Sequence, residues 1–315
     1  MMKIVRSLAA LPHEKNSVVT VGTFDGVHVA HREIIRDVVN RARTREGRSV
    51  VVTFDPHPKE VVPSSKGPVS LLTTLEERIT LLGSLNVDLL YIIAFTREFS
   101  LLTATEFYRT YVVEGVGVGE VVVGYDHMFG RNREAGIEEL LAMGRTFDFS
   151  VFAVHPYSVD GALVSSTRIR RLLLAGDVEH ARELLTVPYQ LRGIVVHGDG
   201  RGSKIGFPTA NLDLADPKKV VPGRGVYAVG VAIGGKVWGG MLNIGVRPTV
   251  SDSGTMMIEV HIFDFSGNLY GQSLSVSFYR KLREERRFPS LEDLTAQLRE
   301  DRVQALRAVA EFVKI

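Results

Sequence analysis

Hydrophobic positions follow two different patterns along the chain. From residue 18 to about residue 185, short apolar runs rich in β-branched residues alternate with segments of helical period. The apolar runs are 18–21, 50–54, 89–95, 121–124 and 151–154, and the helical segments are 32–45, 75–85, 104–113 and 137–145. Continuous apolar runs are typical of parallel strands, which are buried on both faces. The alternation predicts a doubly wound, Rossmann-like parallel sheet, which binds ligands beyond the carboxyl ends of its strands.

The pattern changes near residue 187. Shorter alternating segments follow, separated by glycine-rich turns, at 191–196, 225–233, 236–242, 257–263 and 274–278. Their regular spacing predicts an antiparallel β-barrel, and a last segment of helical period from 290 to 313 predicts a terminal helix. We therefore expect an α/β domain at 1–186 and a β-barrel domain at 187–315.

Composition places the chain among ordinary globular proteins. Hydrophobic residues make up 45% and charged residues 23%, and 315 residues suffice for two cores. The net charge of +2 gives no reason to expect nucleic acid as a partner. The sequence contains no cysteine, which excludes disulfides and thiolate metal sites, and no apolar run approaches the length of a membrane helix. We expect a cytoplasmic monomer or weak homo-oligomer that binds neither membrane nor nucleic acid.

The first candidate site follows the strand at 18–21. The loop and the first helical turn after this strand contain Gly22, Phe24, Asp25, His28 and His31. Helix N-termini attract anions, and two imidazoles three residues apart add hydrogen-bond donors, so the stretch predicts a phosphate site. Taken alone, such a histidine pair more often caps a helix or faces solvent. Metal binding is a weaker alternative, because no third ligand type lies at characteristic spacing.

Three further polar segments follow predicted strands or begin helices. Ser166, Thr167 and Arg170 open a helical segment and predict a second phosphate site, with helix capping as the alternative. The segment 124–136 holds Asp126 and Arg133 and suits either an anion site or a solvated basic loop. The segment 53–58 has Asp55 and His57 between prolines and is best interpreted as a rigid loop.

The barrel region has its own candidate site at 197–211. Gly198, Gly200, Gly202 and Lys204 suit a loop that approaches a polyphosphate, although a long hairpin turn explains the glycines equally well. Thr209 and Asn211 are two residues apart on an extended chain, so their oxygens point to one side and suit Mg²⁺. Glu259 alternates with apolar neighbours, a pattern that a solvent-facing strand position also produces.

Several of these stretches resemble the bacterial bifunctional riboflavin kinase/FAD synthetase family. The stretch 18–36 is similar to the family's GxFDGxHxGH form, with Ala30 in place of a glycine, and 165–170 is similar to SSTxIR. In the segment after Asp126, His127 and Met128 replace the usual residues. GFPTAN at 206–211, MIEVHIF at 257–263 and the segments 243–250 and 269–288 resemble riboflavin kinases. The resemblance spans about residues 18–305 in family order.

The resemblance implies two activities with ATP as a substrate of both. The barrel domain would phosphorylate riboflavin to FMN, with Glu259 as the general base and Mg²⁺ held through Thr209 and Asn211. The first domain would join FMN to AMP, giving FAD and pyrophosphate. The residues implied at its phosphates are His28 and His31 as catalytic groups, with Ser166, Thr167 and Arg170 across the nucleotide. Flavin contacts are implied for Asp126, Arg133, Arg283 and Phe288.

Two other interpretations remain open at this point. One is a kinase with a single activity, in which Ala30, His127 and Met128 have silenced the first domain. The other is a flavin-binding or regulatory protein without catalysis, against which Glu259 and the PTAN motif argue. Supplying FMN and ATP and looking for FAD distinguishes the first from a bifunctional enzyme.

Overall fold

The computed structural model describes residues 1–62, 70–125, 127–131, 134–198, 202–247 and 255–312. The chain forms two compact units, residues 1–166 and 167–315. Helices α6 (Ser166–Leu174) and α7 (Val178–Leu185) fall almost wholly in the second unit, whereas the sequence pattern joined them to the first. The domain boundary near residue 186 therefore stays a prediction.

The first unit is built on a sheet of six parallel strands in the order β1-β4-β3-β2-β5-β6. The strands are β1 (Lys3–Val5), β2 (Ser17–Val21), β3 (Ser49–Asp55), β4 (Leu89–Ala94), β5 (Val118–Gly124) and β6 (Ser150–Val154). The predicted parallel sheet is confirmed, with strands at all five predicted runs. The edge strand β1 was not predicted, because three residues are too short to show a period.

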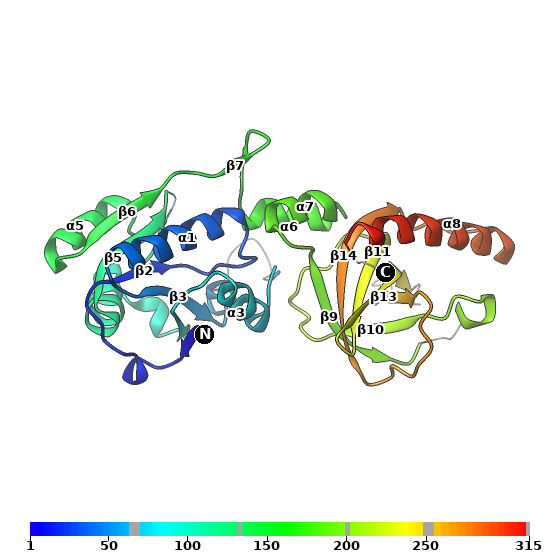
Figure 1. Cartoon of the computed structure of the whole chain (residues 1–315), viewed down its shortest axis with the longest axis horizontal. Helices are drawn as coiled ribbons and strands as arrows, with labels where there is room; N and C mark the ends of the chain where they lie inside the picture. The colour runs from blue at the N-terminus through cyan, green and yellow to red at the C-terminus, as the bar shows by residue number, and fades with distance from the viewer. Residues whose placement is uncertain (63–69, 126, 132–133, 199–201, 248–254, 313–315) are drawn as a thin grey trace. The chain divides into compact units, whose positions relative to one another are not determined.

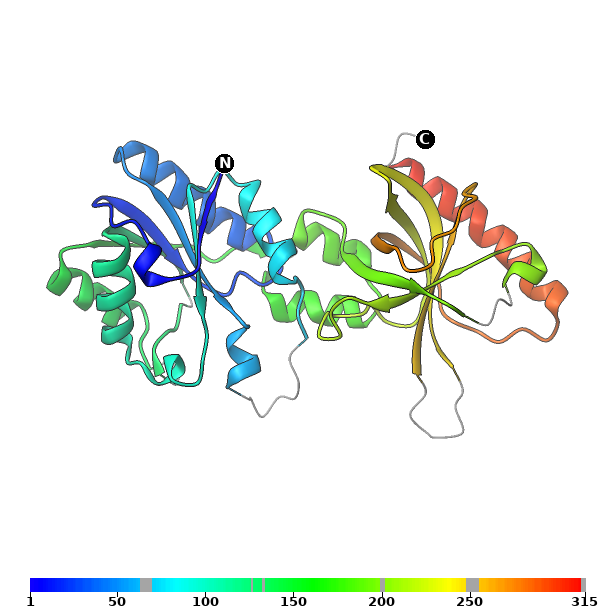
Figure 2. The same ribbon diagram turned by 90° about the horizontal axis from the view of Figure 1, so that it is seen from below.

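Helices cover both faces of this sheet (Figures 1 and 2). On one face, α1 (Val29–Thr44) and α3 (Leu75–Gly83) pack Ile35 and Leu82 against strand residues such as Val51. On the other face, α4 (Ala104–Phe107), its continuation η3 (Tyr108–Val116) and α5 (Ile137–Phe147) pack against residues such as Val50. Short elements complete the unit: η1 (Leu8–Ala10), α2 (Pro58–Val61), η2 (Phe99–Leu101), β7 (Ser158–Val159) and β8 (Ala162–Leu163).

The strand order places a topological switch point at β2. After β2 the chain proceeds to β3 and β4 on one side, and it returns with β5 on the other side of β2. Open α/β sheets bind ligands beyond the carboxyl ends of the strands at such a point. The loop between β2 and α1 therefore lies where the fold provides a binding crevice.

The second unit contains a closed antiparallel barrel in the order β10-β13-β12-β11-β14-β9, as the sequence predicted. Its strands are β9 (Gln190–Val196), β10 (Ala210–Leu214), β11 (Gly225–Ile233), β12 (Lys236–Arg247), β13 (Thr255–Ile262) and β14 (Ser273–Arg283), and the short helix η5 (Gly202–Ile205) precedes β10. Strand β10 was not among the predicted strands, because it directly follows the glycine-rich segment. In the described part of the chain, no helix is both long and apolar enough to cross a membrane.

The terminal helix α8 (Leu291–Ala310) packs on the outer face of the barrel. Ala305 and Ala308 form a hydrophobic cluster with Met241 and Phe263 of the barrel wall. Side chains alternate between the two faces of a strand, so Met241 and residues two apart from it share the face that α8 covers. On the same outer side, Glu179 of α7 pairs with Arg280 of β14 at 3.1 Å.

Candidate active sites

The β2–α1 loop has a strained backbone. Phe24, Gly26 and Val27 have φ angles of +47°, +90° and +41°. Only glycine adopts this left-handed region readily, and a β-branched residue such as Val27 is rare there. Strain of this kind persists where the surrounding structure imposes it, and it clusters at ligand-binding loops.

Asp25 supplies part of that constraint. Its carboxylate, 2% exposed, accepts hydrogen bonds from the backbone N–H groups of Leu72 (3.0 Å) and Thr73 (2.9 Å) and from the Thr73 hydroxyl (3.1 Å). The Gly26 N–H donates to the same Thr73 oxygen at 3.0 Å. The carboxylate thus ties the loop to the segment before α3. A direct contact of Asp25 with nucleotide stays a prediction.

Arg78 of α3 also holds the β2–α1 loop in place. The sequence analysis did not identify this residue. Its guanidinium donates to the Thr23 carbonyl (2.6 Å), the Thr53 hydroxyl (3.1 Å) and the Phe54 carbonyl (3.3 Å). Burial lowers the pKa of Arg78 while nearby carboxylates such as Asp25 oppose that shift. The available signal was a charged residue on the apolar face of a helix.

Gly22 and Phe24 contribute to the packing of the β2–α1 loop. The Phe24 ring is buried in the core beneath α1. A Cβ atom on Gly22 would lie 3.1 Å from this ring, so any other residue at this position would have to shift the ring slightly. Contact of either residue with phosphate stays a prediction.

The two histidines lie together at the start of α1. His28 is the N-cap residue, and its Nδ1 accepts a hydrogen bond from the His31 N–H at 3.4 Å. The rings stack with centroids 3.6 Å apart. Burial, and secondarily the neighbouring His28, lowers the pKa of His31 well below 6.5, and its buried Nδ1 has no hydrogen-bond partner. His31 is therefore neutral at neutral pH, while His28 caps the helix and stacks its ring on that of His31.

The SSTxIR motif meets this loop through its second serine. The Ser166 hydroxyl donates to the Asp25 carbonyl at 3.0 Å, within the first unit. Thr167 and Arg170 follow on α6 and belong to the second unit. The structure thus joins Ser166 to the loop that leads to His28, and the phosphate contacts of Thr167 and Arg170 stay predictions.

The segment after β5 is only partly described. Asp126 and Arg133 lie outside the described residues. Their neighbours Tyr125, His127 and Met128 line a hollow of about 640 Å³ at the carboxyl end of β5. Phe129 is buried against Tyr108, with ring centroids 4.8 Å apart. In the loop at 53–58, His57 caps α2 by accepting from the Lys59 N–H at 3.1 Å, which agrees with the rigid-loop interpretation.

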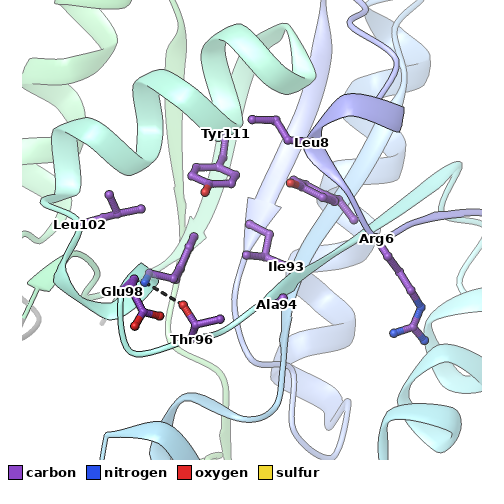
Figure 3. Close-up of a pocket in the computed structure, with 10 residues that line it drawn as sticks. Arg6, Leu8, Ile93, Ala94, Thr96, Glu98, Leu102 and Tyr111 are labelled. Atoms are coloured by element: carbon purple, nitrogen blue, oxygen red, sulfur yellow. Dashed lines mark hydrogen bonds between the residues drawn. The ribbon is translucent and has the colours of Figure 1, made fainter.

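A second hollow of about 410 Å³ lies at the carboxyl ends of β1 and β4 (Figure 3). Ile93, Leu102 and Tyr111 line it, with Arg6 and Glu98 also contributing. Burial, and secondarily Tyr111, raises the pKa of the Tyr91 phenol in its wall to about 12. The residues that line this hollow include none of the predicted site residues.

In the barrel, strand register brings the predicted kinase residues together. Glu259 of β13 pairs with Asn211 of β10 on one side and with Asn243 of β12 on the other. Directly opposite residues in antiparallel strands have Cβ atoms about 4.5–5.5 Å apart on one face of the sheet. The three side chains therefore form a row on the face that α8 partly covers. Asn243 begins the segment 243–250 that resembles riboflavin kinases, but the sequence analysis assigned it no role in the site.

The glycine-rich segment passes directly against this row. A Cβ atom on Gly198 would overlap the Asn211 carboxamide, and one on Gly202 would overlap the Phe207 carbonyl and lie 3.5 Å from the Thr209 hydroxyl. These glycines therefore allow a close approach that a long hairpin turn does not need. Gly200 and the Lys204 side chain lie outside the described residues.

His261 holds the PTAN segment in place from the neighbouring strand. One of its ring nitrogens, Nδ1, donates to the Pro208 carbonyl at 2.7 Å. Burial lowers the pKa of His261, and the hydrogen bond to the Pro208 carbonyl opposes part of that shift. The residue next to Thr209 is thereby fixed to the strand that carries Glu259.

Arg283 is occupied by contacts to α8. Its guanidinium donates to Asp301 at 2.8 Å and 3.0 Å, and to the Glu284 carbonyl at 3.1 Å. The Phe288 ring lies 5.4 Å from the guanidinium of Arg283 and 4.8 Å from that of Arg286. These contacts anchor the helix and order the loop, and the flavin contacts of Arg283 and Phe288 stay predictions.

The residues beside Glu259 fit a hard cation. Among the described residues, no group of three histidine, aspartate or glutamate side chains is arranged to hold a metal ion. Thr209, Asn211 and Glu259 instead offer neutral and acidic oxygens beside a glycine-rich loop. Mg²⁺ prefers such oxygens and keeps waters or substrate phosphates as its other ligands.

Comparisons with known proteins agree with this division of the chain. A family model described as FAD synthetase matches residues 11–168, and one described as riboflavin kinase matches residues 185–309. Together with the switch-point loop and the barrel row, these matches define a two-domain enzyme class that combines nucleotidyl transfer with phosphoryl transfer.

Curated relatives cover nearly the whole chain. Proteins named bifunctional riboflavin kinase/FMN adenylyltransferase are 40% identical in Pseudomonas fluorescens (98% of both chains covered) and 36% identical in Escherichia coli (96% and 97% covered). A crystal structure described as a macrolide-efflux protein from Streptococcus pneumoniae has a TM-score of 0.86 at 34% identity, covering 96% of this chain and 98% of that one. The chain belongs to the bifunctional riboflavin kinase/FMN adenylyltransferase family.

Proposed function

We propose that two separate sites carry the two activities of this family in this chain. The barrel phosphorylates riboflavin with ATP to give FMN. The α/β unit joins FMN to ATP to give FAD and pyrophosphate. The observation that carries the proposal is the presence of two constellations on two folds: the row beside Glu259, and the strained loop with His28 and His31.

In the barrel, Glu259 acts as the general base. It takes the proton from the 5′-hydroxyl of riboflavin, whose oxygen then attacks the γ-phosphorus of ATP, and ADP leaves. Gly198 and Gly202 let the loop backbone approach the phosphates. Thr209 and Asn211 would hold Mg²⁺, which supplies charge neutralisation at the phosphate oxygens when bound. The requirement for Mg²⁺ is part of the proposal.

In the α/β unit, no protein base is required. The FMN phosphate is already anionic, and its oxygen attacks the α-phosphorus of ATP while pyrophosphate leaves. His28, His31, Ser166 and the N-terminus of α1 donate hydrogen bonds to the phosphates. The phosphate contacts of Thr167 and Arg170 are those that the family resemblance implies. Because His31 is neutral, it donates to the phosphates without adding positive charge of its own.

Single substitutions separate the two sites. Losing one preorganised donor typically lowers the rate on the order of 10²–10³-fold, so we expect that loss in FAD formation for His31→Ala, with FMN formation retained. Glu259→Ala should abolish FMN formation and leave the conversion of supplied FMN to FAD intact. Both variants are assayed with riboflavin plus ATP and with FMN plus ATP. Equal loss of both activities in either variant contradicts the two-site assignment.

The single-activity alternative is distinguished by the same FMN assay on the unmodified chain. FAD formed from FMN and ATP shows that Ala30, His127 and Met128 permit adenylyl transfer, and its absence shows that they do not. The cytoplasmic location, the oligomeric state and the flavin contacts of Asp126, Arg133, Arg283 and Phe288 remain predictions.

A further inference from the structure

Asn243 occupies a defined place beside the proposed general base. It lies directly opposite Glu259 in the β12–β13 ladder, while Asn211 lies opposite Glu259 on the other side. Adjacent strands are about 4.8 Å apart, so the carboxamide of Asn243 lies one strand away from the Glu259 carboxylate. Glu259 therefore has one neighbour on the PTAN side and a second neighbour, Asn243, to which the sequence analysis assigned no role.

The Asn243 side chain is available to a ligand. It is half-buried, and its carboxamide makes no hydrogen bond to another described residue. The next residue on the same face is Gly245, and a Cβ atom there would lie 3.1 Å from the Asn243 amide nitrogen and would overlap the Glu285 carboxylate. The Glu285 carboxylate therefore occupies the place that a side chain at position 245 would fill, so the surroundings of Asn243 are polar. The Asn243 amide atoms are not among the buried polar atoms that lack a hydrogen-bond partner, so water reaches the carboxamide and a ligand hydroxyl can replace that water.

The order Asn211, Glu259, Asn243 along the row indicates on which side of Glu259 ATP and riboflavin each bind. Thr209, Asn211 and the glycine-rich segment lie on one side of Glu259, which is the side proposed for the ATP phosphates. The attacking hydroxyl must lie at Glu259, between the phosphates and the rest of the acceptor molecule. The acceptor therefore extends from Glu259 toward β12, where Asn243 is the first polar side chain in the row. Beyond it the row continues through Val226 to Arg283.

We propose that Asn243 binds the internal hydroxyls of the riboflavin polyol chain and selects for a hydroxylated acceptor. The hydroxyl next to the reacting one lies closest to Asn243 when the 5′-oxygen is at Glu259. A carboxamide both donates and accepts, which suits a hydroxyl that does the same. The proposal rests on the assignment of Glu259 as the general base.

The test compares riboflavin with a flavin whose side chain is an unbranched pentyl chain that keeps only the terminal hydroxyl. Asn243→Ala should lower kcat/KM for riboflavin roughly tenfold, because one hydrogen-bond partner of a substrate hydroxyl is lost. The value for the pentyl analogue should stay unchanged, and so should the KM for ATP. Asn243→Ser, which keeps one hydroxyl group, should recover part of the preference for riboflavin. Gln190→Ala removes an exposed carboxamide at the start of β9 and serves as the matched control.

Two results would overturn the proposal. Equal losses on riboflavin and on the pentyl analogue would mean that Asn243 only orients Glu259 or supports the fold. An unchanged kcat/KM for riboflavin would mean that Asn243 makes no useful contact. The assignment of Glu259 as the base is tested separately by assaying Glu259→Ala with both flavins. If that variant still forms FMN, the base assignment fails. The substrate preference of Asn243→Ala is measured independently of the Glu259 variant.

Discussion

Asp25 and His31 belong to one motif but have different roles at the level of single residues. Asp25 accepts hydrogen bonds from Leu72 and Thr73, so its carboxylate shapes the loop. His31 keeps a buried ring nitrogen without a partner at the start of α1. The sequence indicated both residues as part of a phosphate site but could not separate these roles, because the partners of Asp25 are nearly fifty residues away. The roles of Arg78 and Asn243 were missed for a related reason: the groups beside them lie on strands and loops that are distant in sequence.

The depressed pKa of His31 makes the stability of the first unit depend on pH. The folded state keeps His31 neutral, whereas the unfolded chain protonates it below its ordinary pKa of 6.5. This contribution to stability is therefore complete above pH 6.5 and is lost as the pH falls below it, by at most about 1.4 kcal/mol per pH unit. Hydrogen exchange of the α1 amides at pH 7.5 and 5.5 measures the effect.

The control is His31→Asn, which removes the titrating group. We expect its α1 amides to show a smaller loss of protection between the two pH values than those of the unmodified chain. The same loss in both proteins would mean that other groups produce the dependence.

At the level of elements, hydrophobic period predicted the long strands and helices well and the short ones poorly. The runs at 50–54 and 89–95 became β3 and β4, whereas β1 and β10 needed a neighbouring strand to be recognised. The predicted helix at 104–113 exists, but it is a turn of α-helix followed by a π-helical segment that ends at Val116. Side-chain period does not distinguish these hydrogen-bond patterns over so short a length.

The attachment of α8 to the barrel depends on Asp301. This side chain is 1% exposed and accepts hydrogen bonds from Arg283 and Gln297. Removing one partner of a buried ion pair leaves the other charge unpaired and typically costs about 3–5 kcal/mol. We expect Asp301→Asn to lower the free energy of unfolding of the barrel unit by that order. Trp238, the sole tryptophan, lies on β12 and reports unfolding by fluorescence.

A matched control is available on the same helix. Asp264 pairs with Arg302 of α8 at 2.8 Å, but its side chain is 76% exposed. Exposed pairs contribute at most about 1 kcal/mol, so Asp264→Asn should change stability little. Similar losses in the two variants would show that burial of the Arg283–Asp301 pair is not what stabilises α8.

At the level of the whole molecule, two folds carry two partial reactions that share ATP and are linked by FMN. The change of hydrophobic period near residue 187 predicted both folds, because parallel and antiparallel sheets bury their strands differently. Flavin as the substrate did not follow from period or spacing; it came from the resemblance and from the family matches. The register that gathers Asn211, Glu259 and Asn243 required the structure, since strand pairing joins residues far apart in sequence.

The most direct test of the account is a time course of products. Purified protein is incubated with riboflavin, ATP and Mg²⁺, and riboflavin, FMN and FAD are separated at each time point. We expect FMN to appear first and FAD to follow as FMN is consumed. FMN alone would retain the barrel assignment and contradict the activity of the α/β unit, and the absence of both products from folded protein would contradict the whole account.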